Sequence, residues 1–249
     1  MRKAFPIFMI LFASTALAQQ ASERADDVAR RALDVLGGGA AWQKARYIAF
    51  TFNIERDGKP VSSFKQALDR FTGDYRVSGK RPDGIPFEAV VNIRTKKGHG
   101  TLNGKPVTDK AKWDELYDIA YRRFINDMNW LLMPLEMFDT NVQRAYDGER
   151  TDSCGRTWDV LKLTFDANSG LNAGDIYWLW INRDTGVVEE WDTKVGAAPE
   201  EPPIELIFRD YRRVGGLLLS TRREMKNKKQ VLRFDHLQIL SEVPKGAFD

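Results

Sequence analysis

The sequence predicts a mainly β protein of the α+β type, with one antiparallel sheet of about 11 strands and two helices. Apolar and polar residues alternate at period two over most of the chain, as in strands with one buried face. Turn signals such as Asp57-Gly58 and Asn103-Gly104 separate these segments, so consecutive strands can pair as antiparallel neighbours. Helical periodicity occurs near the start and in the middle of the chain, without the βαβ alternation of a parallel sheet.

The chain opens with a segment typical of a secretory signal peptide. Arg2 and Lys3 supply a basic start, an apolar stretch follows, and Ala16-Leu17-Ala18 has the small-x-small pattern of a cleavage site. The apolar stretch is shorter than the roughly 20 residues that a membrane-spanning helix needs. We therefore predict a signal peptide over 1–18 with cleavage after Ala18, followed by one domain over 19–249. Because no cysteine follows the cleavage site, we expect no lipid anchor.

Charge and cysteine content narrow the classes of partner. The formal net charge is +3, and it falls to +1 when Arg2 and Lys3 leave with the signal. Such a charge provides no strong field for attracting nucleic acid, so we predict no nucleic-acid partner. Cys154 is the only cysteine, which excludes an intramolecular disulfide, and we expect its thiol to be buried.

The first predicted helix begins near Ser22, a residue that favours the N-cap position. Apolar residues then recur at helical spacing up to Leu36, which predicts an amphipathic helix of about 15 residues. Gly37 and the two glycines after it end the helix.

The second predicted helix runs from Thr108 to about Leu131. Its apolar residues follow the i, i+3, i+4, i+7 rule, and Asp127 belongs to the polar residues of the opposite face. It is either one long helix or two helices bent at 126–129, and Pro134 ends it. The segment 130–138 is unusually apolar for a connection, which makes it, with this helix, our candidate for a lid.

Strands occupy most of the remaining chain. Their predicted ranges are 47–54, 61–70, 75–78, 87–95, 98–102, 141–146, 158–166, 175–182, 187–194, 204–213, 217–226 and 231–242. The strand at 175–182 is apolar on both faces, because Trp178 and Trp180 alternate with Leu179 and Ile181. One set would face the core and the other would lie under a helix, or one set would line a pocket for acyl chains.

Three blocks of residues carry a resemblance to a known family: Leu36-Gly37-Gly38 with Trp42 and 47–54; 130–135 with Tyr146-Asp147-Gly148 and 158–165; and 175–182 with Asp184-Thr185-Gly186 and Trp191. They resemble the periplasmic lipoprotein carriers and receptors of Gram-negative bacteria, the LolA/LolB-like superfamily, and are similar to an uncharacterised exported family of that fold. The resemblance implies a strongly curved antiparallel sheet, an unclosed barrel whose concave face is covered by the N-terminal and middle helices. It also implies a periplasmic protein.

The resemblance implies a hydrophobic small molecule, a lipid or a lipoprotein as partner, with peripheral contact to a membrane surface. No binding position is carried over from the family. From the apolar pattern, the candidate residues for a hydrophobic cavity are Phe50, Phe52, Trp130, Leu132, Phe138, Trp178, Trp180 and Phe208. An open concave cavity above about 300 Å³ would favour ligand binding. The alternatives are a protein-interaction or sensor module with a self-filled cavity and, with less support, an exported hydrolase.

Catalytic and metal motifs are absent from the sequence. His99 and His236 lie in different predicted strands, and there is no HExxH or cysteine cluster for zinc and no GxSxG elbow for a serine nucleophile. Glu189 and Glu190 are adjacent on a strand and so face opposite sides. We predict no catalytic residue, metal site or cofactor.

The densest basic stretch runs from Arg222 and Arg223 to Lys229. It predicts a solvated hairpin, with contact to anionic lipid headgroups or an acidic partner as the alternative.

Overall fold

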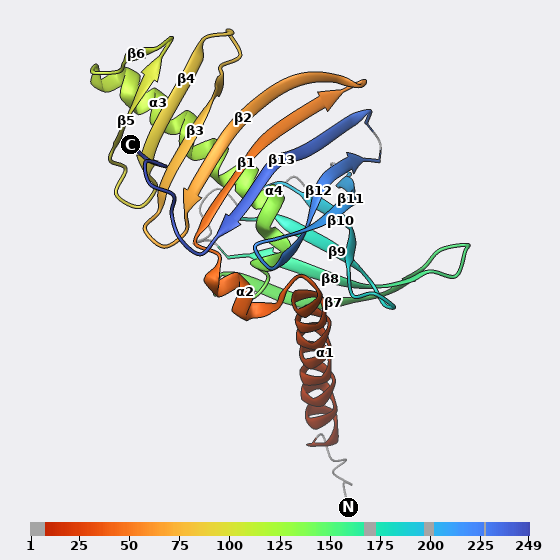
Figure 1. Ribbon diagram of the computed structural model, residues 1–249. Coiled ribbons are helices and arrows are strands. Elements are labelled where there is room, and N and C mark those ends of the chain that lie inside the picture. The colour runs from red at the N-terminus through yellow and green to blue at the C-terminus, as the bar shows by residue number, and fades with distance from the viewer. Residues whose placement is uncertain (1–7, 167–172, 197–201, 227) are drawn as a thin grey trace, which may run out of the picture.

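The computed structural model describes residues 8–166, 173–196, 202–226 and 228–249. Within them, 13 strands form one sheet in the order β6-β5-β4-β3-β2-β1-β13-β12-β11-β10-β9-β8-β7. Each of the 12 neighbouring pairs is antiparallel. The sheet curls strongly but its edge strands β6 and β7 do not pair, so the barrel stays open (Figure 1). The mainly β, unclosed half-barrel predicted from the sequence is therefore confirmed.

The strands are β1 Tyr47–Arg56, β2 Lys59–Asp69, β3 Asp74–Lys80, β4 Pro86–Asn92, β5 Gly98–Leu102, β6 Lys105–Pro106, β7 Val142–Thr151, β8 Thr157–Phe165, β9 Ile176–Asn182, β10 Val188–Lys194, β11 Ile204–Val214, β12 Leu217–Met225 and β13 Gln230–Leu240. The two-residue strand β6 was not predicted. Most of the others differ from their predicted ranges by only a few residues.

The helical segments are α1 Phe8–Val35, α2 Gly38–Lys44, α3 Lys110–Arg123, the π-helix η1 Phe124–Met128, α4 Asn129–Leu132 and the 3₁₀ helix η2 Met133–Leu135. The first predicted helix ends where expected but begins earlier than Ser22, because nothing in the residues before Ser22 breaks a helix.

Turn residues set the register of the meander. Asp57 and Gly58 connect β1 to β2 with φ angles of 51° and 71°, the left-handed values of a tight hairpin turn. Asn103 and Gly104 connect β5 to β6 in the same way, with φ angles of 49° and 74°. These turns confirm the hairpins predicted from the sequence.

The order of the strands determines the course of the middle segment. β1 to β6 and β7 to β13 each form a meander, and the pairing of β1 with β13 joins the two meanders. β6 and β7 are then opposite edges of the sheet, although they follow each other along the chain. The segment from α3 to η2 therefore has to cross a face of the sheet, and Figure 1 shows it inside the curl.

Helix α1 is held to the sheet by a buried carboxylate. Asp159 of β8 is fully buried and lies on the same face as the core residues Leu161 and Leu163. Its oxygens accept hydrogen bonds from Arg24 at 3.1 Å, Arg31 at 2.5 Å and the Tyr146 hydroxyl at 2.8 Å. α1 thus covers the concave side near β7 and β8, as the resemblance implied.

Burial opposes the ionisation of Asp159. The hydrogen bonds from Arg31 and Tyr146 and the charge of Arg24 outweigh that effect and hold the pKa of Asp159 below its usual range.

Gly37 allows the chain to turn sharply after α1. Its φ angle is 124°, and a Cβ atom there would lie 2.5 Å from the carbonyl oxygen of Gly216. The close approach brings the Leu36 carbonyl to the Leu218 amide, which donates to it at 2.8 Å. A glycine is needed at this position for both reasons.

The prediction for Cys154 is wrong. Its thiol is exposed in the turn between β7 and β8. The backbone amide of Cys154 donates to Asp152 at 2.9 Å, so a local turn, with no core beside it, determines its position.

Asp159→Asn tests how α1 is held. The neutral amide cannot compensate Arg24 and Arg31, so we expect the free energy of unfolding at pH 7 to fall by about 1–3 kcal/mol. Urea unfolding followed by circular dichroism measures it. Asp27→Asn, which removes a carboxylate from the exposed Arg30 pair on the same helix, is the control, and an equal effect of both variants would contradict this role of Asp159.

Candidate functional site

The concave face carries the aromatic and aliphatic side chains of the core. Six of the eight candidate residues lie on it: Phe50, Phe52, Leu132 and Phe208 are buried in the main hydrophobic cluster, and Trp130 and Phe138 are half-buried against it. Phe50 and Phe52 contact Phe234, with ring centroids 5.6 Å and 5.4 Å apart. The structure therefore brings these six residues into one apolar layer.

Trp178 and Trp180 do not belong to that layer. On β9, Tyr177, Leu179 and Ile181 are buried in the core, whereas Trp178 and Trp180 are half-buried on the opposite, convex face. Since successive residues of a strand point to opposite faces, these two tryptophans cannot share a concave pocket with the other six.

Among the described residues, charged side chains and not a helix cover the convex tryptophans. The Lys162 ammonium lies 5.9 Å from the Trp178 ring centroid, and that of Lys226 lies 5.7 Å from the Trp180 ring. The Trp180 indole nitrogen donates to Asp192 at 2.8 Å. The expectation that a helix covers the second apolar set of β9 is therefore wrong, because long cationic side chains shield it from water.

Residues 124–138, which we call the lid segment, fill the concave face. They comprise η1, α4, η2 and the three residues that follow. The buried apolar residues of the lid segment are Met128, Leu131, Leu132, Met133, Leu135 and Met137, each at most 4% exposed. In this conformation the lid segment occupies the space that a ligand on the concave face would need.

A polar network anchors the lid segment to the sheet. Asp127 of η1 is fully buried and accepts a hydrogen bond from the Gln66 amide at 2.5 Å. Gln66 in turn accepts from the Tyr75 hydroxyl at 2.6 Å, and Arg123 lies 3.4 Å from Asp127. Burial raises the pKa of Asp127 to about 6, an effect that Arg123 offsets only in part.

The sequence analysis placed Asp127 on the solvent-facing side of the middle helix, and this is wrong. The five residues Phe124–Met128 form a π-helix, in which each turn holds more residues than an α-turn. The helical face therefore rotates after Arg123, and Asp127 turns into the core. A helical projection assumes the same number of residues in every turn, so it does not predict this rotation.

Arg223 is a second buried charge, and the prediction of a solvated basic stretch is wrong for this residue. It belongs to the basic stretch expected to be solvated, but it is only 1% exposed and lies on the core face of β12. Its Nη2 donates to the Leu131 carbonyl of the lid segment at 3.3 Å. Burial lowers the pKa of Arg223 to about 9, and the neighbouring Tyr211 opposes that shift. Strand alternation, which puts Arg222 and Arg223 on opposite faces, could have indicated it.

Aromatic rings surround the Arg223 guanidinium. The ring centroids of Phe208, Phe234 and Trp191 lie 3.9, 5.3 and 5.4 Å from it. Trp191 is fully buried, and its ring lies 5.2 Å from that of Trp130 in the lid segment. Neither Arg223 nor Trp191 was a candidate in the sequence analysis.

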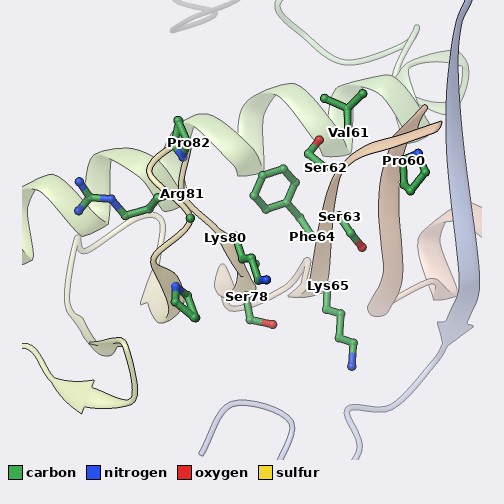
Figure 2. A pocket seen from close by; sticks show the side chains of 13 residues that line it. Pro60, Val61, Ser62, Ser63, Phe64, Lys65, Ser78, Lys80, Arg81 and Pro82 are labelled. Atoms are coloured by element: carbon green, nitrogen blue, oxygen red, sulfur yellow. The ribbon is translucent and has the colours of Figure 1, made fainter. Parts of the chain in front are cut away.

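A groove of about 860 Å³ opens at one rim of the sheet. Pro60, Val61 and Phe64 of β2 and residues 78–82 around the end of β3 contribute to its lining. Figure 2 shows Phe64 at its centre, in front of a helix. The Phe64 ring lies 6.3 Å from that of buried Phe87 and 4.7 Å from the Arg123 guanidinium, so Phe64 separates the groove from the core.

A second groove, of about 390 Å³, lies between the lid segment and strands β9 and β10. Asn129 and Trp130 line it on one side, and Tyr177 and Thr193 line it on the other. Asn129 donates to the Tyr177 hydroxyl at 3.1 Å, which ties the lid segment to β9. Trp130, which lines this groove, packs against Trp191.

The described residues hold no group of three or more His, Cys, Asp or Glu side chains that could bind a metal ion. His99, at the start of β5, and His236, at a bulge of β13, are both exposed. Within the same part of the chain, no helix is long and apolar enough to span a membrane.

Asp127→Asn tests the lid anchor through pH. The folded pKa of about 6 lies above the ordinary value of 3.8, so the folded state binds more protons between these values. Stability should therefore decline as the pH rises from about 4 to about 6, by an amount on the order of 1–3 kcal/mol. Urea unfolding at pH 4 and pH 7 should show a smaller decline in Asp127→Asn than in the wild type.

Asp118→Asn serves as the control for this measurement, because Asp118 forms an exposed ion pair with Arg122 on α3. It should keep the decline of the wild type. Equal declines in the wild type and Asp127→Asn would show that Asp127 does not carry the pH dependence.

The fold has counterparts among solved structures. A LolA superfamily protein from Nitrosomonas europaea aligns over 90% of this chain and 97% of its own, with 10% identity and a TM-score of 0.52. An outer membrane lipoprotein-sorting protein domain from Vibrio parahaemolyticus aligns over 92% and 97%, with 9% identity and a TM-score of 0.47. No protein-family model matches the sequence, and no curated protein does. The curled open sheet and its helical cover give this protein a LolA-like fold.

Proposed function

We propose that the protein binds a hydrophobic ligand, namely an acyl chain, a lipid or a lipoprotein, on its concave face without covalent chemistry. The observation that carries the proposal is the lid segment, which inserts its own apolar side chains where such a ligand would lie. The LolA-like fold supports the same function. Binding then consists of an exchange, in which the ligand replaces the lid segment.

Burial of the lid segment and burial of an acyl chain on the concave face stabilise the protein by similar amounts. Burial of one Leu or Met side chain stabilises by about 1.5–3 kcal/mol, and each methylene of an acyl chain by about 0.8 kcal/mol. The six buried apolar residues of the lid segment are therefore comparable to one acyl chain of roughly 12 to 18 carbons. Neither state dominates by a wide margin, which makes loading and release reversible.

The lid segment has few regular hydrogen bonds to hold it in place. α4 spans four residues and η2 three, with the π-turn of η1 before them. Short helical pieces are marginal by themselves and depend on packing. We infer that the lid segment can leave the concave face as a unit while α3 stays on β3, β4 and β5.

The proposed setting is the periplasm. In this proposal residues 1–18 act as a signal peptide that is cleaved after Ala18. Among the residues whose burial is described, those that pack α1 and its C-terminal end against the core, from Ala25 to Leu36, follow the proposed cleavage site, so cleavage leaves these contacts intact. The mass of the exported protein tests this assignment.

A second candidate function is a protein-interaction or sensor module with a self-filled concave face. The observation in its favour is the complete burial of Leu131, Leu132 and Met133 against the sheet. The two functions differ in whether any amphiphile displaces the lid segment.

Native mass spectrometry of protein purified from a periplasmic extract is the first measurement. We expect a co-purifying or added fatty acid or phospholipid to appear as a bound mass that organic extraction removes. If added amphiphiles never bind, the interaction module replaces the carrier.

Paired leucine substitutions test the exchange itself. Leu132→Ala in the lid segment and Leu116→Ala on α3 each truncate a leucine that is 1% exposed, so both should destabilise by about 2–4 kcal/mol. Only Leu132→Ala weakens the packing of the lid segment, which competes with the ligand for the concave face. It should therefore raise the affinity for a fluorescent fatty acid by roughly tenfold. Equal affinities in the two variants would contradict displacement of the lid segment.

A further inference from the structure

We propose that the ligand of the concave face carries an acidic head group, and that Arg223 and Trp191 bind that group beneath the lid segment. The inference deepens the proposed function and rests on it. It assigns the ligand to a chemical class, the anionic amphiphiles, with one oxyanion at the end of an apolar chain.

Within the described residues, the guanidinium of Arg223 has no counter-ion. No ion pair joins it to a carboxylate within the described residues, and the groups packed on it are the rings of Trp191, Phe208 and Phe234. Nη2 reaches the Leu131 carbonyl, but Nε and Nη1 are buried without a hydrogen-bond partner in the described structure. A cation buried in this way is costly unless an anion compensates it.

A further buried donor lies beside Arg223. The indole nitrogen Nε1 of Trp191 is buried and has no acceptor within the described residues. Trp191 and Arg223 thus present three buried donor nitrogens that have no acceptor within the described residues. Carboxylate and phosphate oxygens are acceptors only, and they match a guanidinium in charge and in geometry.

The closed state alone does not account for an arginine at this position. A methionine or leucine of similar volume would fill the same aromatic cage without the cost of a buried charge. Its attraction to the ring faces offsets that cost only in part. A state in which an oxyanion sits beside the guanidinium accounts for both the charge and the unpaired donors.

The groove between the lid segment and β9 leads to this point. Trp130 lines it and its ring contacts Trp191, so rotation of Trp130 with the lid segment would open a path to Arg223. Arg122 and Arg123 also line the groove, where Arg122 pairs with the exposed Asp118 and Arg123 with the buried Asp127. Asp175 also lines it, but its carboxylate accepts hydrogen bonds from the Tyr177 hydroxyl and the Gly196 amide.

Three amphiphiles with the same twelve-carbon chain test the inference: dodecanoate, dodecyl phosphate and the uncharged dodecanol. Displacement of the neutral fluorophore N-phenyl-1-naphthylamine from the full mature chain reports their affinities. We expect wild-type protein to bind at least one of the two anions tenfold or more tightly than dodecanol. Preference between the carboxylate and the phosphate identifies the source of the oxyanion.

Substitutions at Arg223 and its neighbour separate charge from packing. In Arg223→Met the ratio of anion to alcohol affinity should fall to near one. Arg222→Met, on the opposite face of β12, removes the same charge from the protein and should keep the wild-type ratio. Trp191→Phe removes one donor and should lower the ratio by roughly threefold to tenfold.

Failure of this inference can be distinguished from failure of the proposed function. If the wild type binds dodecanol as tightly as both anions, the acidic head group is wrong while the proposed hydrophobic site stands. If none of the three displaces the fluorophore, the proposed function fails as well. The comparison of amphiphiles on the wild type decides the matter even if Arg223→Met does not fold.

Discussion

An antiparallel sheet that curls without closing leaves an apolar concave face, and that face has to be covered. In this protein the cover follows from the strand order. The two meanders join through β1 and β13, which places β6 and β7 at opposite edges. The chain between them must cross the curl, and the concave side offers the apolar surface on which an amphipathic segment gains most from burial. The lid segment, its anchors and the grooves beside it all depend on this one connection.

The interface between the lid segment and the sheet contains two buried charged groups. Asp127 enters the core from the lid segment, and Arg223 enters it from the sheet. Asp127 has a hydrogen-bonded network through Gln66 and Tyr75, whereas Arg223 has one carbonyl of the lid segment. The two charges lie on different partners of the same interface, and they are not paired with each other. These polar contacts fix where the lid segment lies on the sheet, in addition to its apolar packing.

The convex face also carries large aromatic side chains, which are covered in a different way. Trp178 and Trp180 are half-buried on the convex face. Lys162 and Lys226 extend over the rings, and a hydrogen bond from the Trp180 indole nitrogen to Asp192 holds one of the two rings in place. Aromatic residues on both faces of a strand therefore do not require two cores, because a long cationic side chain can serve as the outer layer.

The sequence by itself determined the elements and their antiparallel connections. Period-two alternation located nearly every strand, and the glycine-containing turns located the hairpins, because both signals depend only on neighbouring residues. Six of the eight apolar candidates lie on the concave face, and their role in binding stays a prediction. The pairing of β1 with β13 depends on contacts between the two ends of the domain, so no local pattern contains it.

Only the tertiary structure decided which polar groups are buried. A π-turn rotated Asp127 inward, the face of β12 placed Arg223 beneath the lid segment, and a local turn exposed Cys154. The sequence shows the type of each side chain, but its surroundings are set by segments up to a hundred residues away. Burial, charge compensation and hydrogen bonding are properties of those surroundings, and they are the properties on which the proposed site depends.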